Sequence, residues 1–167
     1  MPRSDQGVRN DRYKVIPRTL IFLTRGEEVL LLKGGAHKRL WANQYNGIGG
    51  HIERGEDALS AARRELAEES GLQVTNLVLC GTVLVDAGEM TGIGIYVYKG
   101  NYEGGEILSS DEGQLEWINI YDLDRLPLVE DLKVLLPRLL RMGPCEPPFS
   151  ALYDYDEKDE LCVHFGS

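Results

Sequence analysis

Cysteine, basic charge and long apolar runs are scarce in this chain of 167 residues. The three cysteines, Cys80, Cys145 and Cys162, are odd in number and form no Cys-x-x-Cys pair, which argues against a zinc or disulfide framework. No run of about 18 apolar residues offers a transmembrane helix. The first 14 residues also lack the apolar core of a signal peptide. We therefore expect free thiols and a cytoplasmic protein with no membrane contact.

Basic residues are outnumbered by acidic ones, 18 to 27, and the formal net charge is −9. This balance argues against a broad basic surface that would bind a polynucleotide or an anionic lipid. A small phosphorylated ligand stays compatible with it, because a bound divalent cation can reverse the local sign of a site. The length favours a single domain with a sizeable core. The sequence leaves the oligomeric state open, a homodimer included.

The mixture of strand-like and helical patterns predicts α+β or α/β layers around one sheet, and we expect an α+β fold. Residues 1–14 form a polar tail, and the runs "YKVIPRTLIFLT" and "VLLLK" on either side of "RGEE" predict a β-hairpin. The pattern predicts one helix over residues 57–70, ending at Gly71, and a second that starts near Pro127 and kinks at Pro137. Two further strands around "DEKDE" predict a hairpin at the C-terminal end.

The helix expected at residues 57–70 ends in an unusual cluster of acids. Glu65, Glu68 and Glu69 lie within an arc of roughly 100° at 3.6 residues per turn. They sit at the negative end of the helix dipole, where carboxylates repel one another and cations are favoured. Carboxylates on one helix face are the usual ligands of Mg²⁺ or Mn²⁺. The ordinary alternative is a solvated acidic helix end.

The residues around this cluster favour a metal site over that alternative. Gly49 and Gly50 permit close backbone approach just before the helix. Arg64 stands four residues before Glu68 and can bind an acid. Glu56, at the start of the helix, is placed where it can reach round and fix Arg64.

The spacing of these residues resembles the complete signature of the Nudix hydrolases. Five residues separate Gly50 from Glu56, and seven more separate Glu56 from "REL" at positions 64–66. One residue then separates "REL" from "EE" at 68–69, and one separates "EE" from "GL" at 71–72. The resemblance implies the Nudix fold, an α/β/α sandwich around a mixed β-sheet. It would span residues 15–142 and leave residues 143–167 as a C-terminal extension.

The resemblance also implies a reaction and its participants. Nudix hydrolases use divalent cations, here Mg²⁺ or Mn²⁺, to cleave a nucleoside diphosphate linked to another group by attack of water on phosphorus. The matching metal ligands would be Glu65, Glu68 and Glu69, with the carbonyl oxygen of Gly50. Glu56 and Arg64 would orient those ligands.

Further residues resemble the MutT-type branch, which hydrolyses oxidised purine nucleoside triphosphates. Asn46, in "YNGIGG", matches an asparagine that lies against the base, although a turn asparagine is an equal alternative. Glu112 matches a loop glutamate that binds metal or acts as the base. In a related branch of the family, a base-reading aspartate has the short spacing to a proline that Asp131 has to Pro137, but Leu132 stands where its partner acid is expected. A helix-start aspartate is the ordinary reading of Asp131. His51 is placed where it can approach phosphate.

Other functions stay open from the sequence. One is hydrolysis of another nucleoside diphosphate derivative, such as a nucleotide sugar or coenzyme. Others are a nucleotide-sensing module that only binds, and an isomerase that shares the fold. The intact set of acids with Arg64 favours catalysis over binding alone, and no motif supplies the cysteine and glutamate expected of the isomerase.

Overall fold

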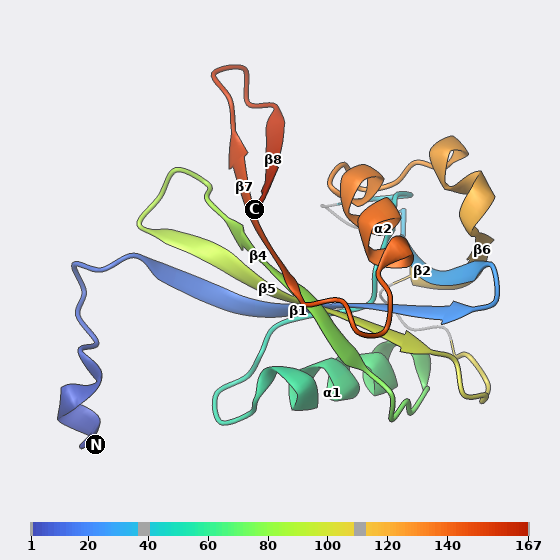
Figure 1. Cartoon of the computed structure of the whole chain (residues 1–167), viewed down its shortest axis with the longest axis horizontal. Coiled ribbons are helices and arrows are strands. Elements are labelled where there is room, and N and C mark those ends of the chain that lie inside the picture. The colour runs from blue at the N-terminus through green and yellow to red at the C-terminus, as the bar shows by residue number, and fades with distance from the viewer. Residues whose placement is uncertain (1, 37–40, 109–112, 167) are drawn as a thin grey trace.

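A computed structural model describes residues 2–36, 41–108 and 113–166 and shows one mixed sheet with helices on both faces (Figure 1). The chain begins with a short 3-10 helix, η1, and a second one, η2, precedes α2. The elements are η1 (Arg3–Gln6), β1 (Lys14–Arg25), β2 (Glu28–Gly34), β3 (Tyr45–Asn46), α1 (Ala58–Ser70), β4 (Val78–Val85), β5 (Thr91–Asn101), β6 (Gly113–Asn119), η2 (Ile120–Arg125), α2 (Leu132–Arg141), β7 (Phe149–Tyr155) and β8 (Leu161–Phe165).

The strands form a single sheet in the order β3-β2-β1-β5-β4-β7-β8, and β6 also pairs with β2. Two neighbouring pairs, β1 with β5 and β4 with β7, are parallel, while the others are antiparallel. The expected hairpin is present, since β1 pairs antiparallel with β2 and Leu23 lies opposite Leu30. The α+β fold with a mixed sheet is therefore confirmed.

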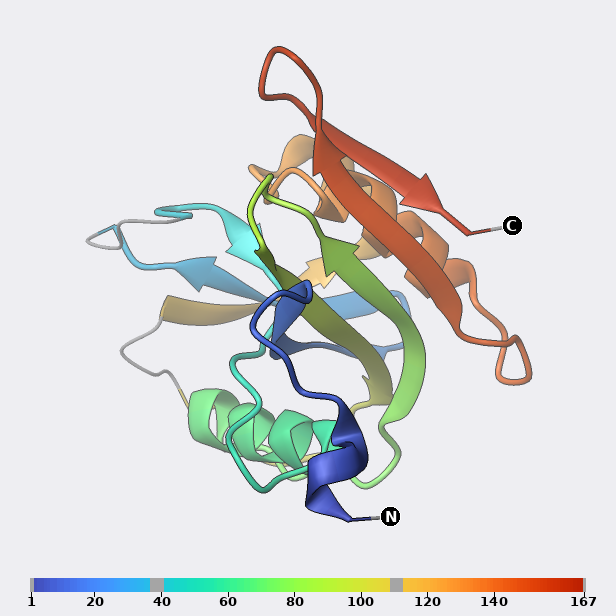
Figure 2. The same ribbon diagram turned by 90° about the vertical axis from the view of Figure 1, so that its left-hand side faces the viewer.

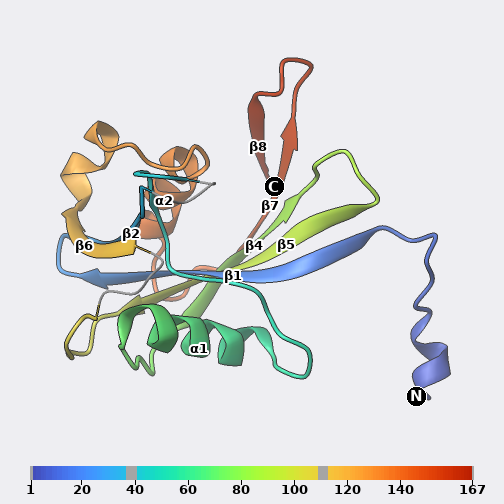
Figure 3. The ribbon, with the colours of Figure 1, turned by 180° about the vertical axis from the view of Figure 1, so that it is seen from behind.

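Alternation along β1 supplies both layers of the core. Phe22 packs in one cluster with the leucines of α2, and its neighbours Ile21 and Leu23 pack in another with Ala62 and Leu66 of α1. All three β1 side chains are fully buried. The two helices accordingly cover opposite faces of the sheet, as the view from behind also shows (Figure 3).

The helix that carries the acidic cluster, α1, is capped at both ends. The Asp57 side chain accepts hydrogen bonds from the backbone N–H groups of Leu59 and Ser60, at 2.9 and 3.0 Å. At the other end Gly71 adopts a left-handed conformation with φ of 73°, and its N–H donates to the carbonyl of Ala67 at 2.9 Å. An aspartate N-cap and a glycine C-cap satisfy backbone groups that the helix leaves unpaired. The predicted helix is therefore confirmed.

The predicted start of the second helix was wrong. Helix α2 begins at Leu132, not near Pro127, and continues through Pro137. The preceding segment pairs with β3 instead: the Tyr45 N–H donates to the Pro127 carbonyl at 2.9 Å, and the Val129 N–H donates to the Tyr45 carbonyl at 3.0 Å. Leucine spacing indicated an apolar face, but it could not reveal this long-range backbone pairing.

The predicted C-terminal hairpin is present as β7 and β8, which pair antiparallel. Strand β7 also runs parallel to β4, with Tyr153 opposite Val85, so that the hairpin extends the main sheet. It lies on the same side of the sheet as α2 (Figure 2). Within the described residues, no helix is both long and apolar enough to cross a membrane.

Candidate active site

The loop before α1 is held against β1 by backbone hydrogen bonds. Ile48 and Ile21 exchange two, at 2.7 and 3.1 Å, and the Thr19 N–H donates to the Gly50 carbonyl at 2.9 Å. These bonds hold the loop at Gly49 and Gly50 against β1. A carbonyl oxygen has two lone pairs, so the Gly50 oxygen retains a site for a second partner such as a cation.

Gly50 lies in direct contact with the acidic face of α1. A Cβ at this position would stand 2.5 Å from the carboxylate of Glu65. A side chain at position 50 would therefore require the flexible Glu65 carboxylate to shift. Glycine at this position leaves room for the Glu65 carboxylate beside the loop, and carboxylate oxygens are donors that Mg²⁺ prefers.

Arg64 is the centre of the ion pairs beside this contact. Its Nη2 donates to Glu56 at 2.7 Å and to the His51 carbonyl at 3.0 Å. Its Nη1 donates to Glu65 at 2.8 Å and to Glu68 at 3.2 Å. The hydrogen bond from Arg64 is the main cause that holds the pKa of Glu56 below its ordinary value. One guanidinium thus links the loop, the start of the helix and two of its acids.

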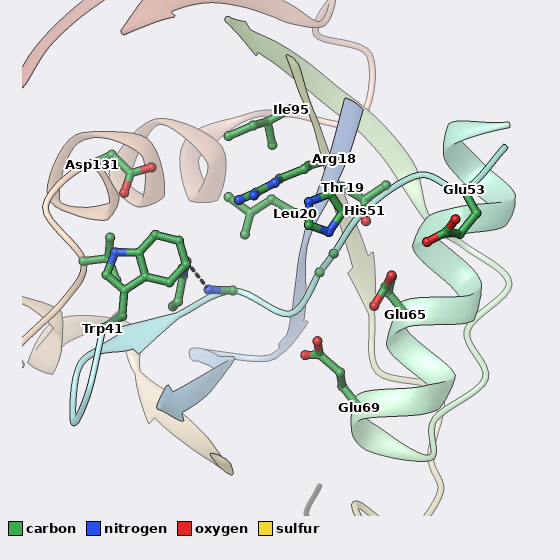
Figure 4. Close-up of a pocket in the computed structure, with 15 residues that line it drawn as sticks. Arg18, Thr19, Leu20, Trp41, His51, Glu53, Glu65, Glu69, Ile95 and Asp131 are labelled. Atoms are coloured by element: carbon green, nitrogen blue, oxygen red, sulfur yellow. Dashed lines mark hydrogen bonds between the residues drawn. The ribbon is translucent and has the colours of Figure 1, made fainter. Parts of the chain in front are cut away.

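A cavity of about 480 Å³ opens over these residues (Figure 4). This size falls within the range of small-molecule sites. Glu65 and Glu69 line it, whereas Glu68 is exposed and its carboxylate lies against Arg64. The lining residues are Arg18, Thr19, Leu20, Trp41, Asn46, Gly47, Gly49, Gly50, His51, Glu53, Glu65, Glu69, Ile95, Val129 and Asp131.

The opposite end of the cavity contains the residues expected near a base. Asn46 comes from β3, and its Oδ1 accepts the Gly47 N–H at 2.8 Å, which leaves the side-chain amide as a donor. Asp131 lies just before α2, and burial raises the pKa of its carboxyl to about 6. His51 also lines the cavity, with an exposed side chain. The structure therefore brings Asn46, Asp131 and His51 into the cavity that Glu65 and Glu69 share.

Two charged lining residues, Arg18 and Glu53, were missed by the sequence analysis. Arg18 lies in the middle of β1, and its buried Nε has no hydrogen-bond partner among the described residues. Figure 4 shows its side chain pointing across the cavity toward the side on which Asp131 lies. Glu53 adds a further acid at the edge. A cation within an otherwise apolar strand, "VIPRTLIFL", was the available signal for Arg18. Glu112, a predicted loop acid, lies outside the described residues.

Comparison with known families identifies this architecture. The model of the NUDIX domain matches residues 14–139, three quarters of the chain. The chain belongs to the Nudix family. Its Nudix box comprises the turn at Gly50 and helix α1, and the protein is a hydrolase of that family.

Two curated relatives carry the same name, "oxidized purine nucleoside triphosphate hydrolase". The one from Danio rerio is 38% identical over 65% of this chain and 67% of its own length. The one from Mus musculus is 31% identical over 86% of this chain and 88% of its own. A MutT protein from Bacillus halodurans has a similar structure, with a TM-score of 0.76, 25% identity and coverage of 90% of this chain and 97% of its own. The Nudix hydrolase is thus most like the MutT-type branch.

A second group of Nudix relatives has a different name. The NAD-capped RNA hydrolase NudC of Pseudomonas fluorescens is 28% identical over 80% of this chain. The chain spans 48% of that relative's length.

Proposed function

We propose that this Nudix hydrolase is a pyrophosphohydrolase that requires Mg²⁺ or Mn²⁺ and cleaves an oxidised purine nucleoside triphosphate, such as 8-oxo-dGTP. The products would be the nucleoside monophosphate and pyrophosphate. The observation that carries the proposal is the shared cavity. Metal-type oxygen donors, Glu65 and Glu69, occupy one end, and hydrogen-bonding groups suited to a base, Asn46 and Asp131, occupy the other. The names of the two animal relatives support the same substrate class.

The donor set at the box end fits a hard divalent cation. Carboxylates of Glu65, Glu68 and Glu69 and the Gly50 carbonyl would hold it, with Arg64 and Glu56 keeping the carboxylates in place. Four acids and one arginine are among the described lining residues, so a polyphosphate would be repelled without added positive charge. Bound there, Mg²⁺ supplies charge neutralisation at phosphorus and lowers the pKa of water.

The bond changes are those of a hydrolysis. The oxygen of water forms a bond to phosphorus, the bridging P–O bond breaks, and pyrophosphate leaves with the electron pair. The proton from water passes to a carboxylate, for which we propose a glutamate of the box or Glu112. General-base help of this kind typically contributes about 10²- to 10⁴-fold.

Selectivity for the oxidised base would come from the far end of the cavity. Oxidation at C8 turns N7 of a purine from an acceptor into a donor and adds an acceptor oxygen at C8. The Asp131 carboxylate can accept from that N7–H. The Arg18 guanidinium, whose buried Nε has no partner within the part of the chain that the structure describes, can donate to the new oxygen. A normal purine would leave a buried group unpaired, at a cost of about 1 to 3 kcal/mol.

A competition between two nucleotides tests this proposal. With Mg²⁺ present, 8-oxo-dGTP and dGTP are mixed at equal concentration, and the monophosphates and pyrophosphate are quantified. We expect 8-oxo-dGTP to be consumed roughly 5- to 150-fold faster. Asn46→Ala should narrow that gap, while Asn10→Ala, at an exposed position before β1, should leave it unchanged. Equal consumption of both nucleotides by the wild type would refute the oxidised-purine assignment but not the Nudix chemistry.

The second candidate is hydrolysis of another nucleoside diphosphate derivative. The relatives named NAD-capped RNA hydrolase favour it, and so does the exposed Trp41 at the cavity, which can stack on an additional ring. Product analysis separates the candidates: a dinucleotide or nucleotide sugar yields two monophosphate products and no pyrophosphate. A nucleotide-binding module without catalysis would release no product from any member of such a panel.

A further inference from the structure

The C-terminal hairpin carries a cluster of metal-binding side chains apart from the active site. Within the described residues, Asp154, Cys162 and His164 form the one group of three such side chains whose ligand atoms all lie within 4.8 Å of one another. The Nε2 atom of His164 lies 3.0 Å from an Asp154 carboxylate oxygen. None of the three lines the cavity over the Nudix box.

Strand register explains why the three side chains meet. Asp154 of β7 lies directly opposite Cys162 of β8, and His164 follows two residues after Cys162 on the same face of the strand. The opposite face of the hairpin, with Tyr153 and Phe165, packs toward the core. The cluster therefore occupies the outward face, where a metal ion can reach it from solvent.

We propose that Asp154, Cys162 and His164 form a binding site for Zn²⁺ or a similar thiol-binding divalent cation. Thiolate, imidazole and carboxylate are the three ligand types that Zn²⁺ takes in proteins. Zinc bonds of about 2.0 Å to nitrogen or oxygen and about 2.3 Å to sulfur place neighbouring ligand atoms about 3.3 to 3.5 Å apart. The observed spacings, 3.0 Å for one pair and at most 4.8 Å for any pair, need only small side-chain rotations.

Such a site would fasten the last strand of the sheet. Among the described residues, strand β8 pairs with β7 alone and forms an edge of the sheet, so its five residues depend on the hairpin for their position. A cation shared by Asp154 of β7 and two residues of β8 would tie the edge strand to its neighbour. Water would take the fourth position on the exposed side. The sequence spacing alone gave no metal motif, because the ligands come together through strand pairing.

Cobalt titration of the reduced full-length protein tests the site. Co²⁺ bound to a thiolate gives a near-ultraviolet charge-transfer band, whereas Co²⁺ bound by the oxygen ligands of the Nudix box does not. In the wild type, we expect the band to saturate at one Co²⁺ bound per chain and to disappear when Zn²⁺ is added. The Cys162→Ser variant should not show the band. His164→Gln and Asp154→Asn should each weaken Co²⁺ binding at least about tenfold. Cys145→Ser is the matched control, because Cys145 is an exposed thiol outside the cluster.

Thermal unfolding provides a second measurement. Zn²⁺ should raise the midpoint of the wild type more than that of Cys162→Ser, because both proteins retain the box carboxylates and differ only in the hairpin ligand. Absence of the charge-transfer band in the wild type would overturn the proposal. So would a band of equal strength in Cys162→Ser, or unchanged affinity in His164→Gln.

Discussion

Arg64 holds Glu56 by two hydrogen bonds, from Nη2 at 2.7 Å and from Nε at 3.3 Å. Only a guanidinium can make this forked contact and still donate to Glu65 through Nη1. Lysine keeps the charge but loses the fork. We therefore expect Arg64→Lys to lower turnover about 10- to 100-fold, in the range for residues that orient metal ligands. The Mg²⁺ concentration for half-maximal activity should rise with it.

Arg63→Lys is the matched control, since Arg63 precedes Arg64 on the same helix but is exposed and contacts only the Thr75 carbonyl, at 3.3 Å, among the interactions of the described residues. It should retain nearly full activity. Equal Mg²⁺ dependence of Arg64→Lys and the wild type would contradict the orienting role.

The contact between Gly50 and Glu65 gives a second prediction. In Gly50→Ala the added methyl group would meet the Glu65 carboxylate at 2.5 Å and push it away from the cavity. Turnover with Mg²⁺ should fall at least about tenfold. The control is Gly143→Ala, where a Cβ meets nothing within 4 Å. If steady-state kinetics show the two variants to be equally active, Gly50 does not set the position of Glu65.

Removal of the carboxylate charge of Glu69 gives a third prediction. Glu69 lines the cavity, and Glu69→Gln keeps its shape while removing a charged oxygen ligand. Turnover should fall at least about tenfold, and circular dichroism should show the fold intact, because the change also relieves repulsion at the negative end of α1. Glu106→Gln, at an exposed acid outside the cavity, is the control. If Glu69→Gln turned over substrate as fast as the wild type, Glu69 would not be a metal ligand.

The local parts of this protein could be predicted from its sequence. Asp57 and Gly71 mark the ends of α1 because capping depends on neighbours within a few residues. The box could be recognised for the same reason, since Glu56 and Arg64 are fixed to each other by one helix and the turn before it. The hairpins followed from alternating apolar residues around short polar turns.

Long-range placements could not be predicted in the same way. The start of α2 depends on pairing between residues 127–129 and Tyr45, more than 80 positions away. Arg18 enters the cavity because β1 lies at the centre of the sheet, beside both the loop at Gly50 and β5. The cation in an otherwise apolar strand marked Arg18 as unusual, but the sequence did not show which loop or cavity β1 would face. The contact between Asp154 and His164 could not be predicted from neighbouring residues either, because it forms across the pairing of β7 with β8.

The partly buried carboxyl of Asp131 gives the last prediction. Burial raises the pKa of this group from 3.8 to about 6, so the folded protein keeps a proton there that the unfolded chain has already lost. The free energy of unfolding must then fall as the pH rises from about 4 to about 6, and the full cost remains above pH 6. A shift of this size corresponds to roughly 2 to 3 kcal/mol. Asp131→Asn has no charge to bury and should escape that cost.

We therefore expect Asp131→Asn to be more stable than the wild type at pH 7 by up to that amount, and nearly equal to it at pH 4. Urea unfolding at the two pH values measures the difference, with Glu130→Gln as the control because Glu130 is its exposed neighbour. The gain in stability should come with a loss of selectivity, because the neutral asparagine carbonyl accepts the N7–H of an oxidised purine more weakly than a carboxylate does. A variant with no stability gain at pH 7 would show that the Asp131 carboxylate is already compensated in the folded protein.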